Sequence, residues 1–274
     1  MKKIAVINDL SGYGRCSLTV AIPVLSAMGH QCCPVPTAIL SNHTEFPVYF
    51  FDDYTEKMTA YTDKWKELGL SFDAVATGFL GSEAQIEIVM DMIRKLESEE
   101  TFVVVDPVMG DHGHAYETYT PEMCEQMKEL VCMADVVLPN VTECCILTDT
   151  PYREENWTRK ELLNMAMMLR LMGAKSVVIT GVREGSYYTN VVLERGQMEA
   201  KFIRTRSSGG ERPGTGDVFS SVVAGALLNG KSLPEAVAQA AGFVKECIKV
   251  SDEEQIPHAN GVCFEKILGK LIKK

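Results

Sequence analysis

A glycine-rich segment in the last quarter of the chain carries the residue types that phosphoryl transfer requires. Gly214-Thr215-Gly216-Asp217 leads into an apolar, helix-like stretch over residues 220–228. Helix N-termini offer unpaired N–H groups, and glycines let the backbone approach an anion closely. Asp217 would then place a proton acceptor beside an anion hole formed by residues 214–216, as in-line transfer to an alcohol needs. Taken alone, these residues leave an ordinary helix cap equally open.

Two further carboxylates follow predicted strands. Asp106 comes directly after the apolar run 102–105, and Glu143 lies three residues after Asn140. Carboxylates at such positions could hold Mg²⁺, directly or through water, while the ion bridges nucleotide phosphates. A strand-ending turn at Asp106 and a helix cap at Asn140 and Glu143 are the alternatives. The joint presence of both carboxylates with the segment 214–217 favours a nucleotide site.

Other nucleotide-binding motifs are absent from the sequence. It contains no G-x-x-x-x-G-K-[ST], no G-x-G-x-x-G after the first strand, and neither the His-Arg-Asp nor the Asp-Phe-Gly motif of protein kinases. Its nine cysteines include no C-x-x-C pair, which argues against a zinc site and favours reduced thiols. The sequence therefore indicates neither a P-loop nor a dinucleotide-binding protein.

Short apolar runs alternate with helical periodicity along the whole chain. Most of these runs are continuously apolar, which is typical of strands covered on both faces. Strand–helix–strand order predicts a mostly parallel sheet with right-handed crossovers, and residues 187–193 and 197–202 predict an antiparallel hairpin at one edge. From Thr215 onward the chain is expected to be mostly helical. The predicted strands are 4–7, 31–35, 74–76, 102–105, 136–138 and 176–179, and the predicted helices are 83–96, 121–133 and 159–172.

Polar segments follow the predicted strands, where ligands bind in open α/β sheets. These segments are residues 8–14, 77–79, 106–111, 139–143 and 180–181. Because the carboxyl ends of parallel strands lie at one edge of a sheet, we expect these segments to converge on a single site.

These motifs together resemble the ribokinase-like superfamily, and most closely its vitamin B6 kinase branch. The segments Ser41-Asn42-His43-Thr44 and Asp106-Pro107-Val108-Met109-Gly110-Asp111 are similar to that branch, whereas Gly214-Thr215-Gly216-Asp217 marks only the superfamily. The resemblance implies one three-layer α/β/α domain over residues 1–274, with a mostly parallel central sheet, helices on both faces and a small β extension near residues 44–51. It also implies an ATP-dependent kinase that phosphorylates the hydroxymethyl group of pyridoxal, pyridoxine or pyridoxamine.

The resemblance also implies roles for individual residues. Asp217 is expected to be the catalytic base, with Gly214, Thr215 and Gly216 as its anion hole. Mg²⁺ is expected at Asp106 and Glu143, and a homodimer is implied; a requirement for a monovalent cation such as K⁺ stays open. The ATP-binding residues are expected to be Asp106, Asp111, Asn140, Glu143 and Thr180, and the substrate-binding residues Asp9, Ser11, Thr44, Phe79 and Asp217.

Two departures from the B6 kinase pattern concern the substrate end. Asp9-Leu10-Ser11-Gly12 is closer to the hydroxymethylpyrimidine kinases of thiamine synthesis, and Phe79 stands where many B6 kinases have tyrosine. A hydroxymethylpyrimidine kinase is therefore the main alternative, ahead of a sugar kinase. From another class, a non-catalytic vitamer or nucleotide sensor is the remaining alternative, but it would need no catalytic base.

Composition limits the partners and the location. The net charge is −10 and the pI about 5.1, which disfavours nucleic acid as a ligand. No apolar run is long enough to span a membrane, and the apolar segment after Met1 is too short for a signal peptide. The sequence therefore predicts a cytoplasmic enzyme whose partners are a small-molecule substrate and ATP.

Overall fold

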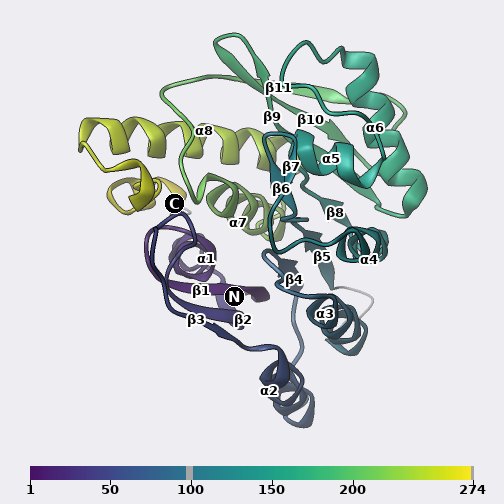
Figure 1. The fold of residues 1–274 in the computed structure, drawn as a ribbon, viewed down its shortest axis with the longest axis vertical. Coiled ribbons are helices and arrows are strands. Elements are labelled where there is room, and N and C mark those ends of the chain that lie inside the picture. Colours follow the sequence, from purple (N-terminus) through teal and green to yellow (C-terminus); the bar gives the residue numbers. More distant parts are fainter. Residues whose placement is uncertain (97–100, 273–274) are drawn as a thin grey trace.

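The computed structural model describes residues 1–96 and 101–272, and within them the fold is built on one nine-stranded sheet (Figure 1). The strand order is β11-β10-β9-β8-β5-β4-β1-β2-β3. The strands are β1 (Lys3–Tyr13), β2 (Gln31–Asn42), β3 (Phe51–Asp53), β4 (Ala74–Thr77), β5 (Phe102–Val105), β8 (Val136–Val137), β9 (Ser176–Glu184), β10 (Tyr187–Leu193) and β11 (Lys201–Arg206). The hairpin of β6 (Gly110–Asp111) and β7 (His114–Ala115) stands apart from this sheet.

The six central strands pair in parallel, and antiparallel strands occupy both edges. Helices connect the neighbouring parallel strands, two more follow the last strand, and together they cover the sheet. They are α1 (Ser17–Ala27), α2 (Thr55–Glu67), α3 (Glu83–Leu96), α4 (Pro121–Cys132), α5 (Val141–Leu147), α6 (Arg159–Met172), α7 (Thr215–Leu228) and α8 (Leu233–Glu253), followed by the 3₁₀ segments η1 (His258–Asn260) and η2 (Glu265–Leu271).

Two hydrophobic cores lie on opposite faces of the sheet. Ile4 and Val6 of β1 pack with α1, α7 and α8, whereas Ala5 and Ile7 pack with helices α2 to α6. Figure 1 shows α1, α7 and α8 on one side of the sheet and α2 to α6 on the other. Because alternate side chains of each central strand enter different cores, the strands need continuous apolar runs. The expected three-layer α/β/α arrangement with helices on both faces is therefore confirmed.

The structure changes the bounds of several predicted elements. Residues 8–13, expected as a loop, continue β1 and pair with the equally extended end of β2, with a register shift between Asn8 and Leu10. The second strand of the edge hairpin is Lys201–Arg206 rather than 197–202. In the expected β extension, only Phe51–Asp53 is a strand, which pairs with residues 38–40. Pairing between distant segments decides these bounds, and local sequence patterns do not report it.

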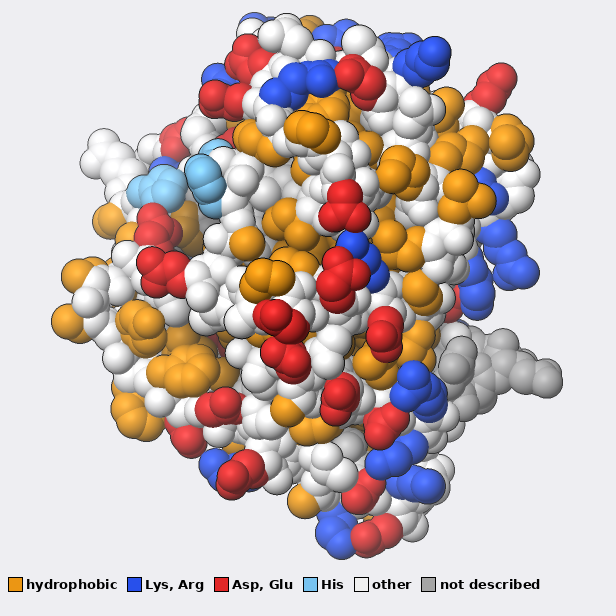
Figure 2. Space-filling view, turned by 45° about the vertical axis from the view of Figure 1, so that its right-hand side comes forward, with side chains coloured by type: hydrophobic (Ala, Val, Ile, Leu, Met, Phe, Trp, Pro, Cys, Tyr) orange, Lys and Arg blue, Asp and Glu red, His pale blue; other side chains and the backbone are white. Residues whose placement is uncertain are grey.

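The surface is mixed in charge. On the face shown in Figure 2, acidic and basic side chains are interspersed among patches of hydrophobic side chains. Among the described residues, no helix is long and apolar enough to cross a bilayer.

Candidate active site

Asp217 lies in the first turn of α7, directly after the glycine-rich loop. Gly214 is the N-cap and has a φ of 78°, in the left-handed region that favours glycine. A Cβ at this position would also overlap the backbone carbonyl oxygen of Arg15. Thr215 Oγ1 donates to the Arg212 carbonyl oxygen at 3.0 Å, which fixes the start of the helix. The chain before α7 therefore passes so close to the N-terminal segment that position 214 requires glycine.

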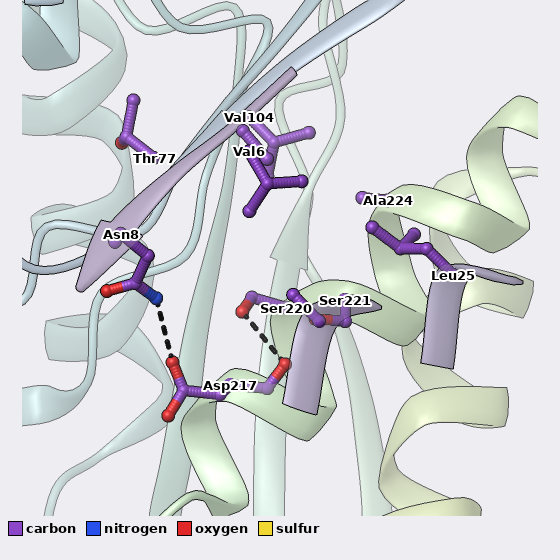
Figure 3. Close-up of a pocket in the computed structure, with 12 residues that line it drawn as sticks. Val6, Asn8, Leu25, Thr77, Val104, Asp217, Ser220, Ser221 and Ala224 are labelled. Carbon is purple, nitrogen blue, oxygen red and sulfur yellow. Dashed lines mark hydrogen bonds between the residues drawn. The ribbon is translucent and has the colours of Figure 1, made fainter. Parts of the chain in front are cut away.

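The carboxylate of Asp217 is held from the opposite end of the sequence. Asn8 Nδ2, at the end of the apolar part of β1, donates to Asp217 Oδ1 at 3.1 Å (Figure 3). The backbone N–H of Ser17 faces this carboxylate and favours its ionised form. Burial raises the pKa of Asp217 to about 6 and the charge of Asp9 adds to the rise, against these two donors. A carboxyl group tuned in this way can accept a proton near neutral pH.

Asp9 and Ser11 point toward each other and away from solvent. Ser11 Oγ donates to Asp9 Oδ2 at 2.8 Å, Ser17 Oγ donates to Asp9 Oδ1, and both Asp9 and Ser11 are buried. Burial raises the pKa of Asp9, and the two hydroxyl donors oppose the rise. The φ of Ser17 is 54°, an unusual value for a residue with a side chain. Asp9 thus anchors the first residue of α1, whose N–H faces Asp217.

Asp106 lies beside Asp217 at the end of β5. Its carboxylate interacts with the Ser220 hydroxyl, and burial and then the negative charge of Asp217 raise its pKa to about 8. Ser220 also contacts Asp217, because its hydroxyl donates to the Asp217 carbonyl oxygen at 3.4 Å. Two carboxyl groups on neighbouring elements therefore share a site in which each disfavours the ionised form of the other.

Glu143 is buried and both of its carboxyl oxygens accept backbone N–H groups. Oε2 accepts from Asn140 N at 2.8 Å and Oε1 from Met109 N at 3.2 Å. The side chain of Asn140 completes a capping box by accepting from Glu143 N. Burial and then the charge of Asp106 raise the pKa of Glu143. Glu143 therefore ties α5 to the loop after Asp106, which is the capping arrangement that the sequence offered as an alternative.

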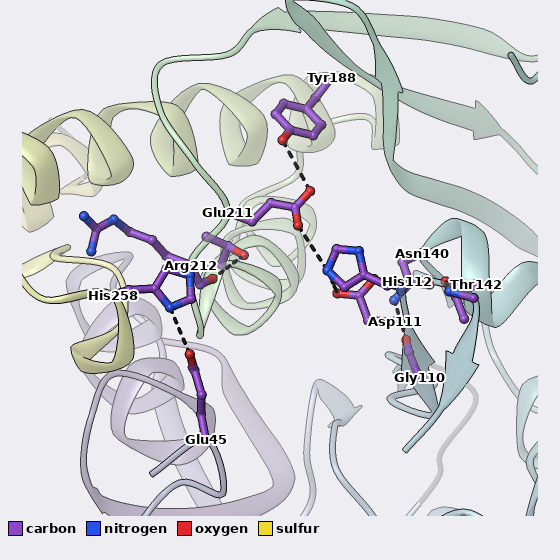
Figure 4. A network of polar contacts seen from close by, with 12 residues as sticks. Glu45, Gly110, Asp111, His112, Asn140, Thr142, Tyr188, Glu211, Arg212 and His258 are labelled. Carbon is purple, nitrogen blue, oxygen red and sulfur yellow. Dashed lines mark hydrogen bonds and ion pairs between the residues drawn. The ribbon is translucent and has the colours of Figure 1, made fainter. Parts of the chain in front are cut away.

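The other predicted ATP-binding residues surround this loop. Asn140 Nδ2 donates to the Gly110 carbonyl oxygen at 2.9 Å (Figure 4). Asn140 also forms an isolated parallel bridge with Thr180. Asp111 lies on the exposed β6–β7 hairpin. Its neighbour His112 places Nε2 3.3 Å from an oxygen of Glu211, in the glycine-rich loop before α7. The hairpin therefore contacts the glycine-rich loop just before the helix that carries Asp217.

The two remaining predicted substrate residues, Phe79 and Thr44, lie in different surroundings. Phe79 is close to the base, because its N–H donates to Asn8 Oδ1 at 2.9 Å. Thr44 is exposed in the segment between β2 and β3. Its neighbour His43 is held by Ala259, whose carbonyl oxygen lies 2.7 Å from His43 Nε2, and by an aromatic contact with Phe46.

Sequence reasoning missed Asn8 and Ser17. The available signal for Asn8 is its place at the end of a buried strand, but the family pattern in this segment lies at Asp9 and Ser11. Ser17 had no signal of its own, because its contribution comes from its backbone N–H. A cavity of about 20 Å³, with room for about one water molecule, adjoins Asn8 and Asp217 and is also lined by Thr77 (Figure 3).

The cluster of carboxyl groups at Asp106, Glu143 and Asp217 fits a magnesium ion that is shared with phosphates. In the ranges that the structure describes, no three Asp, Glu, His or Cys side chains are arranged to enclose a metal. Mg²⁺ is commonly held by one or two carboxylates together with substrate phosphates and waters. Asp106 supplies such a carboxylate. The Tyr119 hydroxyl, buried without a partner among the described residues, has its pKa raised by burial and then by Glu143 and could donate to a bound water.

Comparisons with known proteins show what this chain is similar to as a whole. A family model for phosphomethylpyrimidine kinase matches residues 21–263. A solved structure from Bacteroides thetaiotaomicron, described as a phosphomethylpyrimidine kinase, has a TM-score of 0.96 and 40% identity, and the match covers 100% of this chain and 94% of that one. A second crystal form of that protein, solved with pyridoxal, has a TM-score of 0.93 over 98% of this chain and 95% of that one.

Curated relatives include kinases for both rings. A pyridoxine kinase of Bacillus subtilis is 29% identical over 256 residues, which cover 90% of this chain and 84% of that protein. A hydroxymethylpyrimidine/phosphomethylpyrimidine kinase of Aquifex aeolicus is 30% identical over 178 residues, which cover 65% of this chain and 67% of that protein.

Proposed function

Because the chain belongs to the phosphomethylpyrimidine kinase family, we propose that it transfers the γ-phosphoryl group of ATP to the hydroxymethyl group of pyridoxal, pyridoxine or pyridoxamine. It is a phosphotransferase that acts on an alcohol group and uses ATP, as its kinase relatives imply. The observation that carries the choice of a pyridine is the likeness, 40% identical over 98% of the chain, to a protein solved with pyridoxal.

The geometry supports a direct role for Asp217 in the reaction. The substrate hydroxyl donates its proton to the Asp217 carboxylate as its oxygen forms a bond to the γ-phosphorus. The bond between the γ-phosphorus and the β–γ bridging oxygen breaks, and ADP leaves with the electron pair. The backbone N–H groups of residues 214–216, at the N-terminus of α7, would stabilise charge on the transferred group.

Asp106 is the residue that we propose to hold Mg²⁺, and Glu143 would act at one remove through water. When bound, the ion would neutralise charge on the nucleotide phosphates. Asp111, Asn140 and Thr180 are the further residues that we propose to contact the nucleotide. Because both oxygens of Glu143 already accept backbone N–H groups, its larger contribution is to hold the Met109–Asp111 loop and Asn140 in place.

Thr44 and Phe79 are the residues that we propose to contact the vitamer ring. A hydroxymethylpyrimidine is the second candidate, favoured by the Asp9-Leu10-Ser11-Gly12 motif and by the Aquifex relative. However, Asp9 and Ser11 are occupied with each other and with Ser17 inside the protein. This arrangement favours a positioning role for the motif over recognition of a pyrimidine ring. A homodimer and a cytoplasmic location stay predictions.

A substrate panel with ATP and Mg²⁺ tests the proposal. We expect kcat/KM for the best B6 vitamer to exceed that for hydroxymethylpyrimidine by at least about tenfold, or ~1.4 kcal/mol of transition-state binding. Asp217→Asn should lower kcat by roughly 10²–10⁴ with KM for ATP little changed. A higher kcat/KM for hydroxymethylpyrimidine would overturn the pyridine assignment, and near-normal turnover of Asp217→Asn would remove Asp217 as the base.

A further inference from the structure

Asn8 lies at the centre of a hydrogen-bond arrangement that can hold its amide in only one orientation. Its Oδ1 accepts two backbone N–H groups, from Asp9 at 3.0 Å and from Phe79 at 2.9 Å. An amide oxygen accepts hydrogen bonds and an amide nitrogen donates them. Because the two N–H donors require the oxygen on their side, the Nδ2 group must face the other way. It donates to Asp217 Oδ1 at 3.1 Å.

The space around this amide is equally restricted. Asn8 is 6% exposed, and it lies against the backbone of Gly78. A Cβ added at Gly78 would overlap the Asn8 side-chain amide itself, at Nδ2, Cγ and Oδ1. Gly78 does not have a positive φ that would by itself require glycine. The feature that requires a glycine there is the space taken by the Asn8 amide.

From these contacts we propose that Asn8 is a positioning residue that orients the carboxylate of Asp217, and that Gly78 is small in order to admit the Asn8 amide. This proposal rests on the proposed role of Asp217 as the base. The hydrogen bond from Asn8 restrains the carboxylate at Oδ1, the N–H of Ser17 favours its ionised form, and carboxylate oxygens have further lone pairs that can accept from a substrate hydroxyl. A base held in this way meets the hydroxyl in a near-attack geometry, and small misplacements of such a group lower turnover steeply.

The proposed role explains the residue types at both Asn8 and Gly78, which lie in separate segments. Asn8 lies on β1, Gly78 follows β4, and Asp217 lies on α7, yet one side-chain amide connects all three. Figure 3 shows the Asn8 side chain extending from β1 toward the first turn of α7. A residue that bound substrate directly would change the KM for the vitamer, whereas a residue that orients the base changes kcat.

A double-mutant cycle tests the inference with pyridoxal, ATP and Mg²⁺. Asn8→Ala and Gly78→Ala should each lower kcat by roughly 10–100-fold, with KM for ATP and for pyridoxal within about twofold. In the Asn8→Ala background the added methyl group at position 78 meets no amide, so Gly78→Ala should cost little more. The double variant should therefore be about as active as either single variant, a strong departure from additivity.

Two further variants control for folding. Asn8→Asp keeps the size of the side chain and both backbone acceptor contacts but loses the donor, so it should lose kcat at least as strongly as Asn8→Ala. Asn229→Ala removes a different side-chain amide, which donates to the Met28 carbonyl oxygen at the far end of α7, and should leave kcat within about twofold. Melting temperatures of all variants, with and without ADP, report folding.

The outcomes separate this proposal from the proposed function. Additive losses, a rise in KM for pyridoxal with unchanged kcat, or kcat of Asn8→Ala within twofold of wild type would each overturn the positioning role. Loss of folding in both Asn8 variants would also overturn it, because Asn8 would then have a purely structural role. If Asp217→Asn remains active, the proposed base is wrong, whereas an inactive Asp217→Asn with a normal Asn8→Ala removes only the positioning role.

Discussion

Asp217 combines a buried carboxylate with donors that favour its ionised form. Burial raises its pKa to about 6, and the Ser17 N–H and Asn8 Nδ2 limit that rise. Full desolvation without donors would leave the group protonated at neutral pH, and full exposure would leave it too weak a base. If Asp217 is the base, as proposed, the environment of this one side chain sets the pH range in which the enzyme can work.

The pH dependence of turnover follows directly from this pKa. As the proposed base, Asp217 must be ionised to accept the substrate proton, so kcat/KM for pyridoxal should fall as the pH is lowered through about 6, by roughly tenfold per unit well below it. Initial rates with ATP, Mg²⁺ and subsaturating pyridoxal between pH 5 and 8 measure this limb. A kcat/KM that stays level down to pH 5 would contradict the assignment of the base.

The raised pKa of Asp217 affects stability in the opposite direction from turnover, because the free energy of unfolding falls as the pH rises. A carboxyl group whose pKa is raised in the folded protein favours folding in its protonated form, so its contribution is lost as the pH rises from its usual value of 3.8 through about 6. Asp217→Asn, which carries no charge, should therefore be more stable than wild type at pH 7 by about 1–2 kcal/mol and similar to it near pH 4. Thermal melts of both proteins across this range check the sign. A variant less stable than wild type at pH 7 would contradict it.

At the scale of elements, α5 and the loop after β5 depend on each other through Glu143. This carboxylate accepts N–H groups from Asn140, at the start of α5, and from Met109, which lies 34 residues before Glu143. A capping box at a surface helix satisfies only its own helix, whereas this one also fixes the loop that leads to Asp111. The cap and the nucleotide site are therefore parts of one structure.

Glu143→Ala should lower stability and weaken the response to Mg²⁺ together. Two backbone N–H groups lose their acceptor, which should reduce the free energy of unfolding by roughly 2–3 kcal/mol, and the loosened loop should raise the Mg²⁺ concentration for half-maximal rate. Glu161 forms the capping box of α6 with Thr158 and is a matched control. Glu161→Ala should lower stability less than Glu143→Ala does, without changing the Mg²⁺ curve. Equal Mg²⁺ curves for both variants would limit Glu143 to a structural role.

The sequence predicted elements well where local periodicity determines them. The bounds of α3 and α6 match the predicted helices 83–96 and 159–172, and β5 matches the strand 102–105. The sequence predicts a loop in the second half of β1, because four of residues 8–13 are Asn, Asp, Ser and Gly, whereas pairing with β2 holds this segment in a strand. Contacts between distant residues decide such elements.

The same limit applies to the candidate site. The carboxylates at the ends of strands were visible in the sequence because parallel strands place their carboxyl ends together. The Asn8–Asp217 contact, by contrast, joins residues 209 positions apart and depends on the register of β1 against β4 and on the path of α7. Sequence patterns could name residues that carry charge, but not the amide that orients one of them.

At the scale of the whole molecule, the C-terminal segment connects parts of the site that are distant in sequence. Arg15 donates to the Asn260 carbonyl oxygen and pairs with Glu265, and Arg212 donates to the Ile256 carbonyl oxygen. Figure 4 shows Glu45, between β2 and β3, paired with His258 of this segment. The segment before α1, the β2–β3 connection and the glycine-rich loop are therefore held by one short stretch of chain, residues 256–265.

His43 is the more buried of the two histidine contacts between the β2–β3 connection and this C-terminal segment. Its Nε2 lies 2.7 Å from the Ala259 carbonyl oxygen and its ring packs against Phe46 and the backbone of Gly14.

His43→Phe keeps a ring in this position but removes the donor. Because Thr44 is the next residue, we expect KM for pyridoxal to rise by roughly 3–10-fold, the effect of one lost hydrogen bond, with KM for ATP unchanged. His258→Ala removes only an exposed ion pair with Glu45, which contributes little, and should leave both KM values within about twofold. Steady-state kinetics of the two variants test this prediction. Equal effects on the KM values of both substrates, or equal effects of both variants, would mean that the C-terminal segment supports the fold as a whole and does not position the β2–β3 connection over the vitamer.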